Sequence, residues 1–519
     1  MTTKPNLRLM AVASWVVLTF SVSTFARLYD GTLCGNKGKL KGYLLAGFLI
    51  CLLISPAQGQ YGPGNGTSSN PYQILEPHHM NAIGDNPSHW GKHFKLMNDI
   101  DLSGYTGSDF NIIGSGWDEP FTGVFNGNGY KIYNFSYGPV APDSYVGIFG
   151  MVGKVGGASG EIKNLGLINP NIDVLAFMTG ALAGRVVLGT ITNCYIEGGS
   201  VLGDNSVGGL VGSSGFINAE IINCYTNTSV SGDWDVGGLC GYNGGTISNC
   251  YAIGNVVGNS NTGGLVGDNK ENSLISNCYA SGIIQGADDT GGLAGRNWGG
   301  TISNCYATGN VSGDDVTGGL VGKNSGANGY TATITNSYAT GNVNGTGNFV
   351  GGLVASHAGF IDPAEITNCY SVGSVSGDTS IGGLIGGNFA GSVVDSFWDK
   401  TTSGQSSSDG GTGKITSEMQ TESTFTSAGW DFVAETTNGT EDIWTIHDGN
   451  NYPKLVWPLV NFVGWYEVDL ADYAFFANYW EFTNCGDAND CNGVDLDFSD
   501  AVDRKDLKIL FDKWLTGLQ

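Results

Sequence analysis

Residues 291–322 read GGLAGRNWGGTISNCYATGNVSGDDVTGGLVG, and much of the chain repeats this pattern on either side of them. A Gly-Gly-Leu step recurs, beginning at Gly208, Gly237, Gly263, Gly291, Gly318, Gly351 and Gly382. An Asn-Cys-Tyr step recurs at Asn193, Asn223, Asn249, Asn277, Asn304 and Asn368, with Asn336-Ser337-Tyr338 and Asp395-Ser396-Phe397 as variants. The period of 26 to 33 residues is typical of stacked structural repeats and not of one globular core.

Each repeat contains three short β-prone runs, such as Gly319–Gly322, Thr301–Thr308 and Asn310–Ser312, separated by Gly, Asn and Asp. These residues favour turns that need a positive φ. No repeat has room for a crossover helix, so each unit is expected to form one coil with three strands and three turns. Stacking at about 4.8 Å would bury the apolar side chains in one column. We therefore expect an all-β fold, a right-handed parallel β-helix. Its test is one internal row formed by Leu210, Leu239, Leu265, Leu293 and Leu320.

The pattern Gly-Gly-Leu-any-Gly followed by Asn-Cys-Tyr-Ala-Thr-Gly-Asn resembles the GLUG repeat of bacterial surface proteins and of some secreted IgA-specific metallopeptidases. The likeness covers residues 147–400. Residues 60–146 resemble the lead-in of such arrays and are expected to form N-terminal capping coils, with a short helix over residues 78–86. Residues 401–460 resemble their endings, an aromatic-rich C-terminal cap and linker. These aromatics could plug the end of the coil stack or form a platform for stacking carbohydrate.

The composition excludes several classes of partner. Of 519 residues 85 are Gly, 13% are charged, and the formal net charge is −25. This acidic balance disfavours nucleic acid and anionic membrane surfaces as partners and favours calcium. The four histidines at positions 78, 79, 89 and 93 fit no zinc spacing, so we interpret them as surface or packing residues.

Residues 1–59 contain a predicted secretory signal. Lys37, Lys39 and Lys41 precede an apolar run at residues 43–54, and small residues follow it at 56–59, as in a signal peptide. This predicts a secreted or cell-surface protein with no integral membrane domain in the mature chain. The earlier apolar run at residues 9–26 leaves two alternatives, a start codon assigned too far upstream or a membrane-anchoring first segment.

One repeat position is occupied by cysteine, at Cys194, Cys224, Cys250, Cys278, Cys305 and Cys369. Stacked coils would place these side chains one above another. Serine at positions 337 and 396 indicates that the site needs a small side chain, so we expect buried, reduced thiols rather than disulfides between coils. Cys240 lies elsewhere in its coil and is also expected to be buried.

Acidic residues mark the turn after each third predicted strand. The members are Asp204, Asp233, Asp288, Asp314 and Asp378, with Asp235, Asp289 and Asp315 beside them. Two interpretations remain open: Asp is a good turn former, or the carboxylates form a column of weak cation sites. Catalytic residues are not predicted, because no basic residue of the repeats recurs in register with a carboxylate cluster.

The last segment, residues 461–519, resembles a dockerin domain. Helices are expected at Asp469–Trp480 and Asp503–Trp514, and the loop before the second has the spacing of an EF-hand-type calcium loop. The ligands implied for one calcium ion are Asp495, Asp497, Ser499, Ala501, Asp503 and Asp506. Asp500 stands where such loops prefer Gly, and the first unit lacks most ligands. The alternative is an acidic run at a helix N-terminus. Cys485 and Cys491 are the best disulfide candidates.

Taken together, these patterns predict a non-catalytic extracellular or cell-surface repeat protein for adhesion, recognition or scaffolding. Its expected partners are a surface glycan or protein ligand and, for the tail, a cohesin-like module. The main rival is a β-helical polysaccharide lyase or hydrolase, since fold alone does not decide function. A purely structural spacer is the third alternative.

Overall fold

The computed structural model describes residues 60–139, 144–215, 218–433, 435–456, 470–481, 494–496 and 501–516. The chain divides into two compact units, Met1–Gln60 and Tyr61–Gln519, and the second contains the repeats. The predicted signal segment, residues 1–59, lies outside the described residues. So do Cys34, Cys51, Cys485 and Cys491.

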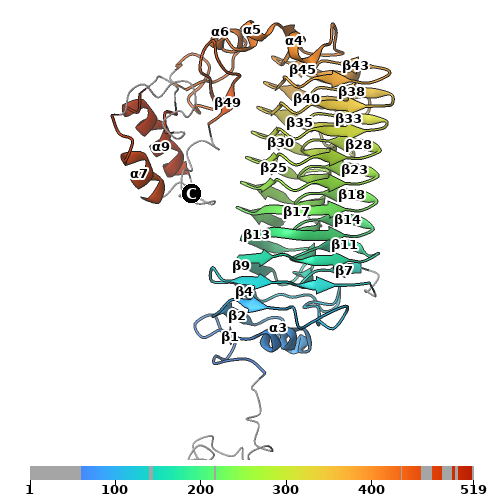
Figure 1. Ribbon diagram of the computed structural model, residues 1–519, viewed down its shortest axis with the longest axis vertical. Helices are drawn as coiled ribbons and strands as arrows, with labels where there is room; N and C mark the ends of the chain where they lie inside the picture. The colour runs from blue at the N-terminus through green and yellow to red at the C-terminus, as the bar shows by residue number, and fades with distance from the viewer. Residues whose placement is uncertain are drawn as a thin grey trace, which may run out of the picture. The chain divides into compact units, whose positions relative to one another are not determined.

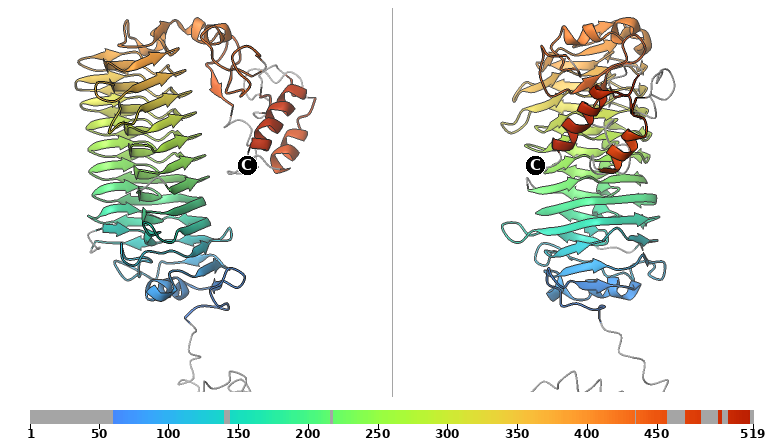
Figure 2. Two further views of the ribbon diagram at one scale, coloured as in Figure 1. Left: turned by 180° about the vertical axis from the view of Figure 1, so that it is seen from behind. Right: turned by 90° about the vertical axis from the view of Figure 1, so that its left-hand side faces the viewer.

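The repeats form a parallel β-solenoid whose coils lie one upon another, as Figure 1 and Figure 2 show. One coil consists of β28 (Asp288–Gly291), β29 (Ala294–Trp298), β30 (Thr301–Ser303), β31 (Tyr306–Ala307) and β32 (Val311–Gly313). Each strand pairs in parallel with its equivalent in the next coil. The predicted parallel coil is therefore confirmed, whereas its right-handed sense stays a prediction.

The expected three strands are found in the coil over residues 177–202, whereas each of the five coils over residues 234–376 has five strands. Thr301–Thr308 divides at Asn304, which has a φ of 52° and turns the chain. Gly319–Gly322 is not one strand but spans the corner between two strands. The apolar pattern alone did not show these extra bends, which the backbone makes at asparagines with a positive φ and at paired glycines.

Three sheets run along the stack, and the first two have nine strands each. Sheet I contains β7 (Ser144–Val146), β11 (Phe177–Gly180), β14 (Asn205–Gly208), β18 (Trp234–Gly237), β23 (Ser260–Gly263), β28, β33 (Val316–Gly318), β38 (Phe349–Gly351) and β43 (Ile381–Gly382). Sheet II contains β8 (Phe149–Val152), β12 (Ala183–Val186), β15 (Val211–Ser214), β19 (Cys240–Asn243), β24 (Val266–Asn269), β29, β34 (Val321–Ser325), β39 (Val354–Ala358) and β44 (Ile385–Phe389).

Sheet III has 29 strands in three rows. The first row is β1 (Tyr72–Ile74), β2 (His93–Leu96), β4 (Val124–Asn126), β9 (Gly160–Ile168), β13 (Gly189–Leu202), β16 (Ala219–Ile222), β20 (Thr246–Ser248), β25 (Leu274–Ser276), β30, β35 (Ala332–Thr335), β40 (Ala364–Thr367) and β45 (Ser392–Val394). The second row, which β9 and β13 extend into, adds β3 (Ile100–Asp101), β5 (Lys131–Tyr133), β17 (Tyr225–Ser231), β21 (Tyr251–Ala252), β26 (Tyr279–Ala280), β31, β36 (Tyr338–Ala339), β41 (Tyr370–Ser371), β46 (Phe397–Asp399) and β47 (Thr412–Lys414). The third row adds β6 (Ser136–Tyr137), β10 (Asn171–Asp173), β22 (Val256–Val257), β27 (Ile284–Gln285), β32, β37 (Val343–Gly345) and β42 (Val375–Ser376).

The main core is a large hydrophobic cluster that runs inside the coils, beside a small separate cluster of Val343, Val350 and Val375. The repeat leucines at positions 210, 239, 265, 293 and 320 are fully buried members of the large cluster. The predicted internal row is therefore confirmed. Burying an apolar side chain of this size contributes roughly 1.5–3 kcal/mol, so a column of coils gains stability that a single coil lacks.

The glycine that closes the Gly-Gly-Leu-any-Gly step is needed where sheet II meets sheet I. A Cβ added to Gly295 would lie 2.4 Å from the carbonyl carbon of Asn261 and 2.5 Å from the backbone nitrogen of Thr262. Both neighbours are backbone atoms of sheet I, so they cannot yield as a flexible side chain would. Most coils therefore leave space here for backbone contact between the two sheets, and β39 fits the small side chain of Ala355 at the equivalent position.

Gly295→Ala is expected to destabilise the protein by roughly 1–3 kcal/mol, as is typical of an overpacked core, because the backbone beside it must move. Urea unfolding followed by circular dichroism would measure the change. Gly104→Ala is the matched control, since a Cβ there meets nothing within 4 Å. Equal stability of the two variants would contradict this role for Gly295.

The cysteine position forms a ladder of free, buried thiols, as predicted. The backbone N–H of Cys194 donates to Sγ of Cys224 at 3.4 Å, and that of Cys305 donates to Oγ of Ser337 at 3.1 Å. The position therefore needs a small side chain that also accepts a hydrogen bond. Burial raises the pKa of Cys240 and of Cys369 to about 12, which keeps both thiols protonated and unreactive.

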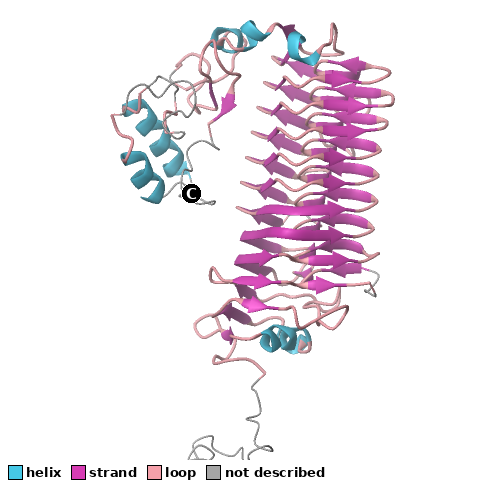
Figure 3. Cartoon of the chain, viewed as in Figure 1, coloured by secondary structure: helices cyan, strands magenta, loops and turns pink. Residues whose placement is uncertain are grey.

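The helices lie outside the run of coils, as Figure 3 shows. They are α3 (Pro77–Gly84), the 3-10 helix η1 (Pro87–His89), α4 (Lys400–Ser403), α5 (Thr416–Met419), α6 (Glu422–Thr426), α7 (Leu470–Ala477) and α9 (Arg504–Thr516). The expected capping helix thus exists as α3, and the two expected tail helices correspond to α7 and α9. A short antiparallel pair, β48 (Trp444–Thr445) and β49 (Lys454–Leu455), follows the coils.

The aromatic residues after the coils need a correction to their predicted place. Trp398 is the one that joins the internal core of the coils. Trp430 and Trp444 instead pack against the outward tyrosines Tyr338 and Tyr370 and are fully buried there. Because their ring faces are covered, these two tryptophans do not form a carbohydrate platform. They cover the outer side of the last coils rather than plug their end.

A second buried ladder runs through the corner after sheet II. Its members are Ser214, Asn243, Asn269, Asn297, Asn324 and His357, each hydrogen bonded to the next. The last distances are 3.1 Å from Asn324 Nδ2 to His357 Nδ1 and 3.2 Å from His357 Nε2 to the Ser392 carbonyl oxygen. His357 is therefore neutral, with its proton on Nε2.

Burial lowers the pKa of His357 below its usual value of 6.5. The unfolded chain binds this proton more readily, so we expect stability to fall as pH drops from 6.5 toward the lower folded-state pKa. The slope from this one group is at most about 1.4 kcal/mol per pH unit. His357→Asn places at this position the asparagine that the preceding coils carry, and it should remove this part of the pH dependence in urea unfolding. Identical pH profiles would contradict the assignment.

Candidate functional site

One outward column of sheet II gathers the basic residues of the coils. Its members, paired in register coil by coil, are Arg185, Ser213, Tyr242, Asp268, Arg296, Lys323 and Ser356. Between residues 164 and 399 the sequence contains four basic residues, and the fourth, Lys270, follows Asp268 by two positions. The chain therefore concentrates its few coil cations on one surface.

The expectation that no basic residue aligns with a carboxylate cluster is therefore wrong. Asp268 pairs directly with Arg296, which pairs with Lys323. These residues are 28 and 27 positions apart in the sequence, and each repeat carries a different residue at this place. Only the strand register brings them together, so a search for a recurring motif missed them.

Asp268 is a fully buried carboxylate held by two cations. Arg296 donates to it through Nη2 and through Nε, the latter at 3.1 Å, and Lys270 Nζ lies 2.9 Å from Oδ2. A charge at this depth is stable only when it is paired and hydrogen bonded. A guanidinium has five N–H donors and an ammonium three. Both cations therefore keep donors for a further acceptor.

Two more carboxylates of sheet I act on the same cations. Asp235 and Asp289 take equivalent positions in β18 and β28 with positive φ angles of 52° and 43°. Burial raises the pKa of Asp289 to about 6, against the opposing charge of Lys323, and burial also raises the pKa of Asp235. Asp235 Oδ1 accepts a hydrogen bond from Asn261 Nδ2 at 2.7 Å. We name Asp235, Asp268, Lys270, Asp289, Arg296 and Lys323 the charged cluster.

Aromatic rings lie beside the cations of this surface. The Lys270 ammonium is 5.6 Å from the Tyr242 ring centre, and the Arg296 and Lys323 cations are 5.2 and 5.9 Å from that of Trp298. Further toward the N-terminal cap, Arg185 lies 4.8 Å from the ring of Trp117. These contacts stabilise the cations near the surface and give the strip both apolar and charged groups.

The predicted acidic column is interrupted in the structure. Backbone hydrogen bonds link Asp204 to Asp233 in the next coil, but the next two coils carry Asn259 and Ala287 at this place before Asp314. Asp288 lies one position after Ala287, in β28. Asn259 Nδ2 donates to Asp233 Oδ1 at 3.0 Å, and Thr346 Oγ1 donates to Asp314 Oδ1 at 3.2 Å. Among the described residues no group of three or more His, Cys, Asp or Glu side chains could hold a metal ion. The hydrogen bonds of Asp233 and Asp314 are those expected of turn residues, and the column of weak cation sites stays a prediction.

The predicted calcium loop is described only in part, because Asp497 and Ser499 lie outside the described residues. Asp495 and Asp506 are buried carboxylates. Asp506 Oδ1 accepts the N–H of Leu496 at 2.6 Å and Oδ2 accepts the N–H of Asp503 at 2.8 Å. The two ends of the predicted loop thus lie close together, as both the calcium interpretation and the helix N-terminal interpretation require.

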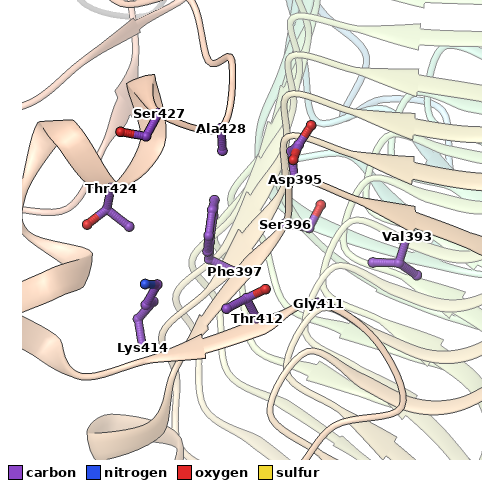
Figure 4. Close-up of a pocket in the computed structure, with 10 residues that line it drawn as sticks. All are labelled: Val393, Asp395, Ser396, Phe397, Gly411, Thr412, Lys414, Thr424, Ser427 and Ala428. Carbon is purple, nitrogen blue, oxygen red and sulfur yellow. The ribbon is translucent and has the colours of Figure 1, made fainter.

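The hollows on the described surface include the following two. One of about 470 Å³ lies between the last coil and α6 and is drawn in Figure 4. The other, of about 590 Å³, lies along β1, β2, β4 and β9 and includes His93, Lys95 and the Glu161–Lys163 ion pair. Neither was predicted, because each is formed by segments distant in the sequence.

None of the helices among the described residues is long and apolar enough to cross a lipid bilayer.

Comparison with known proteins identifies the repeat. A family model described as the GLUG motif matches residues 232–257, 286–312 and 316–344.

Relatives share parts of the coils. Halomucin from Haloquadratum walsbyi is 34% identical over 172 residues, which are 32% of this chain and 2% of halomucin. A protein of Evansella cellulosilytica, provisionally named a Gly-rich membrane protein, is 36% identical over 196 residues, which are 35% of this chain and 21% of that protein. The chain thus spans well under two thirds of these relatives. A solved structure from Bacteroides ovatus, provisionally named an immunoglobulin A1 protease, aligns with 77% of this chain and 96% of its own, with a TM-score of 0.33 and 23% identity.

All three ranges matched by the family model lie within the coils. The dockerin-like interpretation of the tail stays a prediction, whereas the presence of GLUG motifs in the coils, within those three ranges, is confirmed.

Proposed function

We propose that this chain is a secreted or cell-surface, non-catalytic recognition protein whose coils bind an anionic polysaccharide along the charged cluster. The observation that carries the proposal is the gathering of all four basic residues of positions 164–399 on one strip of sheet II. The chain has a net charge of −25, so most of its surface repels an acidic polymer, and within positions 164–399 the cations of this strip are the groups that can offset the repulsion. One relative is described as a membrane protein, which supports a location at the cell surface.

Lys323 offers the sharpest test, because it lies in the strip yet is not a partner of Asp268. Lys323→Glu is expected to weaken binding of dextran sulfate or polygalacturonate at least roughly tenfold, since a charge-assisted contact becomes a repulsion. Lys400→Glu, the same charge reversal at a basic residue outside the strip, is the matched control. Uncharged dextran should not bind to the strip. Equal affinity of parent and Lys323→Glu would contradict the proposal.

The same binding should depend on pH through Asp289. Its pKa is raised to about 6 by burial, so it is largely neutral below pH 6 and adds a negative charge beside Lys323 above it. Polyanion affinity is therefore expected to fall as pH rises through 6, and Asp289→Asn should flatten this part of the profile. Biolayer interferometry at matched ionic strength would measure both chains. A steeper profile in the variant would count against the role of Asp289.

One observation favours a polysaccharide-degrading enzyme as the second candidate. A buried carboxyl with a pKa of about 6 beside an Arg–Asp pair has the properties of a general acid. The discriminating experiment incubates the parent chain with polygalacturonate and measures reducing ends and unsaturated products. Product formation that Asp289→Asn abolishes would establish the enzyme, and an intact polymer would favour recognition.

For the tail we propose one calcium ion bound by Asp495, Asp497, Ser499, Asp503 and Asp506 with the Ala501 carbonyl, and a cohesin-like partner. The burial of Asp495 and Asp506 at one place supports this. Titration calorimetry should show one calcium site in the parent and a large loss of affinity in Asp495→Ala. Unchanged affinity would remove this loop from consideration.

A further inference from the structure

The last coil differs from the others at one turn position. The residue before the cysteine position has a positive φ and is asparagine at Asn164, Asn193, Asn223, Asn249, Asn277, Asn304, Asn336 and Asn368. These side chains bridge successive coils, as where Asn368 Nδ2 donates to Asn336 Oδ1 at 3.4 Å. In the last coil the residue is Asp395, with a φ of 44°. A carboxylate therefore replaces the amide at the end of the row.

Asp395 is also the member of this row that borders the hollow beside the cap. Figure 4 shows Asp395 on the strand side and Thr424 and Ser427 on the helical side, with Thr412 and Lys414 below them. Trp430 Nε1 donates to the Asp395 carbonyl oxygen at 2.8 Å and fastens the cap beside this turn. The hollow has a volume of about 470 Å³, within the range of small-ligand sites.

The lining combines groups of opposite hydrogen-bonding character. The Asp395 carboxylate only accepts, the Lys414 ammonium only donates, and the hydroxyls of Thr412 and Ser427 do both. Thr424 Oγ1 already donates to the Glu418 carbonyl oxygen at 2.8 Å, so it offers an acceptor. Adjacent hydroxyls of a sugar ring match this set, because each can donate to a carboxylate while accepting from an ammonium. An anionic ligand is disfavoured because the hollow already has the Asp395 carboxylate. The Glu418 carboxylate is also near, with its Oε1 3.8 Å from Lys414 Nζ.

We propose that the hollow between β46 and α6 binds one neutral hexose unit, with Asp395 accepting from ring hydroxyls and Lys414 donating to them. The ligand enters from the open side, so the unit can belong to a longer glycan. This inference shares with the proposed function the idea that the chain binds carbohydrate. It involves no residue of the charged cluster.

The test uses the full chain with glucose, galactose, mannose and N-acetylglucosamine as probes in saturation-transfer NMR titrations. At least one should bind the parent, and Asp395→Asn should weaken it about tenfold through loss of a charge-assisted hydrogen bond. Asn is the residue of eight other coils at this position, so the fold is retained. Asp378→Asn, in an exposed turn, is the matched control. Lys414→Gln should weaken the same sugar.

Three results would overturn the proposal: no hexose binds the parent, Asp395→Asn binds as tightly as the parent, or glucuronate binds more tightly than glucose. The last would identify an anion site instead. Polyanion binding lost in Lys323→Glu but hexose binding retained would separate the two sites. Failure of the charged cluster would therefore not be mistaken for failure of the hollow.

Discussion

Asp268→Ala is expected to lower the free energy of unfolding by about 3–5 kcal/mol, the usual cost of removing one partner from a buried ion pair. Asp268 is fully buried and receives hydrogen bonds from Arg296 and a contact from Lys270 at 2.9 Å. Both cations are largely covered, with 23% and 19% of their side chains exposed. Without the Asp268 carboxylate, the positive charges of Arg296 and Lys270 repel each other and lose the negative charge that balanced them.

Urea unfolding by circular dichroism measures this loss, and hydrogen exchange in β24 and β29 locates it. Asp378→Ala, an exposed carboxylate of the coils, should change stability by less than about 0.5 kcal/mol. The double variant Asp268→Ala, Arg296→Ala should recover part of the loss, because it removes a stranded charge. A loss below about 1 kcal/mol for Asp268→Ala alone would show that the pair behaves as a surface salt bridge.

Asn269→Ala is the second change with a large expected effect, about 2–6 kcal/mol from two buried polar partners left unsatisfied at 1–3 kcal/mol each. Asn269 Oδ1 accepts from Asn243 Nδ2 at 2.8 Å, and its Nδ2 donates to Asn297 Oδ1 at 2.8 Å. Both neighbours are fully buried, so water cannot replace the missing amide.

Thermal and urea unfolding of Asn269→Ala should be compared with Asn259→Ala, an exposed asparagine of the same coil region. The control is expected to lose only a few tenths of a kcal/mol. Asn269→Ser should fall between them, since Ser214 occupies the equivalent place two coils earlier and bonds to Asn243 at 2.9 Å. Equal losses at positions 269 and 259 would show that the buried ladder adds no stability.

The row of stacked tyrosines shows how much the sequence of a repeat reveals without knowledge of its tertiary contacts. Tyrosine follows the cysteine position in seven repeats, and the structure stacks these seven rings with neighbouring centroids 4.8–5.0 Å apart. Once the coils stack, the recurring tyrosines lie one above another, but the recurrence does not reveal which residues cover them. Trp430 and Trp444 reach Tyr370 from 60 and 74 positions further along the chain, and periodicity says nothing about such contacts.

The coil, its internal leucines and its reduced cysteines could be predicted from the sequence, because their cause is local and recurs with each repeat. A residue type that returns every 26 to 33 positions must lie above its own copy once coils stack, whatever the rest of the chain does. The charged cluster and the hollow beside α6 could not be predicted in this way. Asp268, Arg296 and Asp395 each occur once at positions where other repeats carry different residues. Only the register of parallel strands and the packing of the cap place their charges beside partners, because that proximity is a property of tertiary contacts and not of sequence spacing.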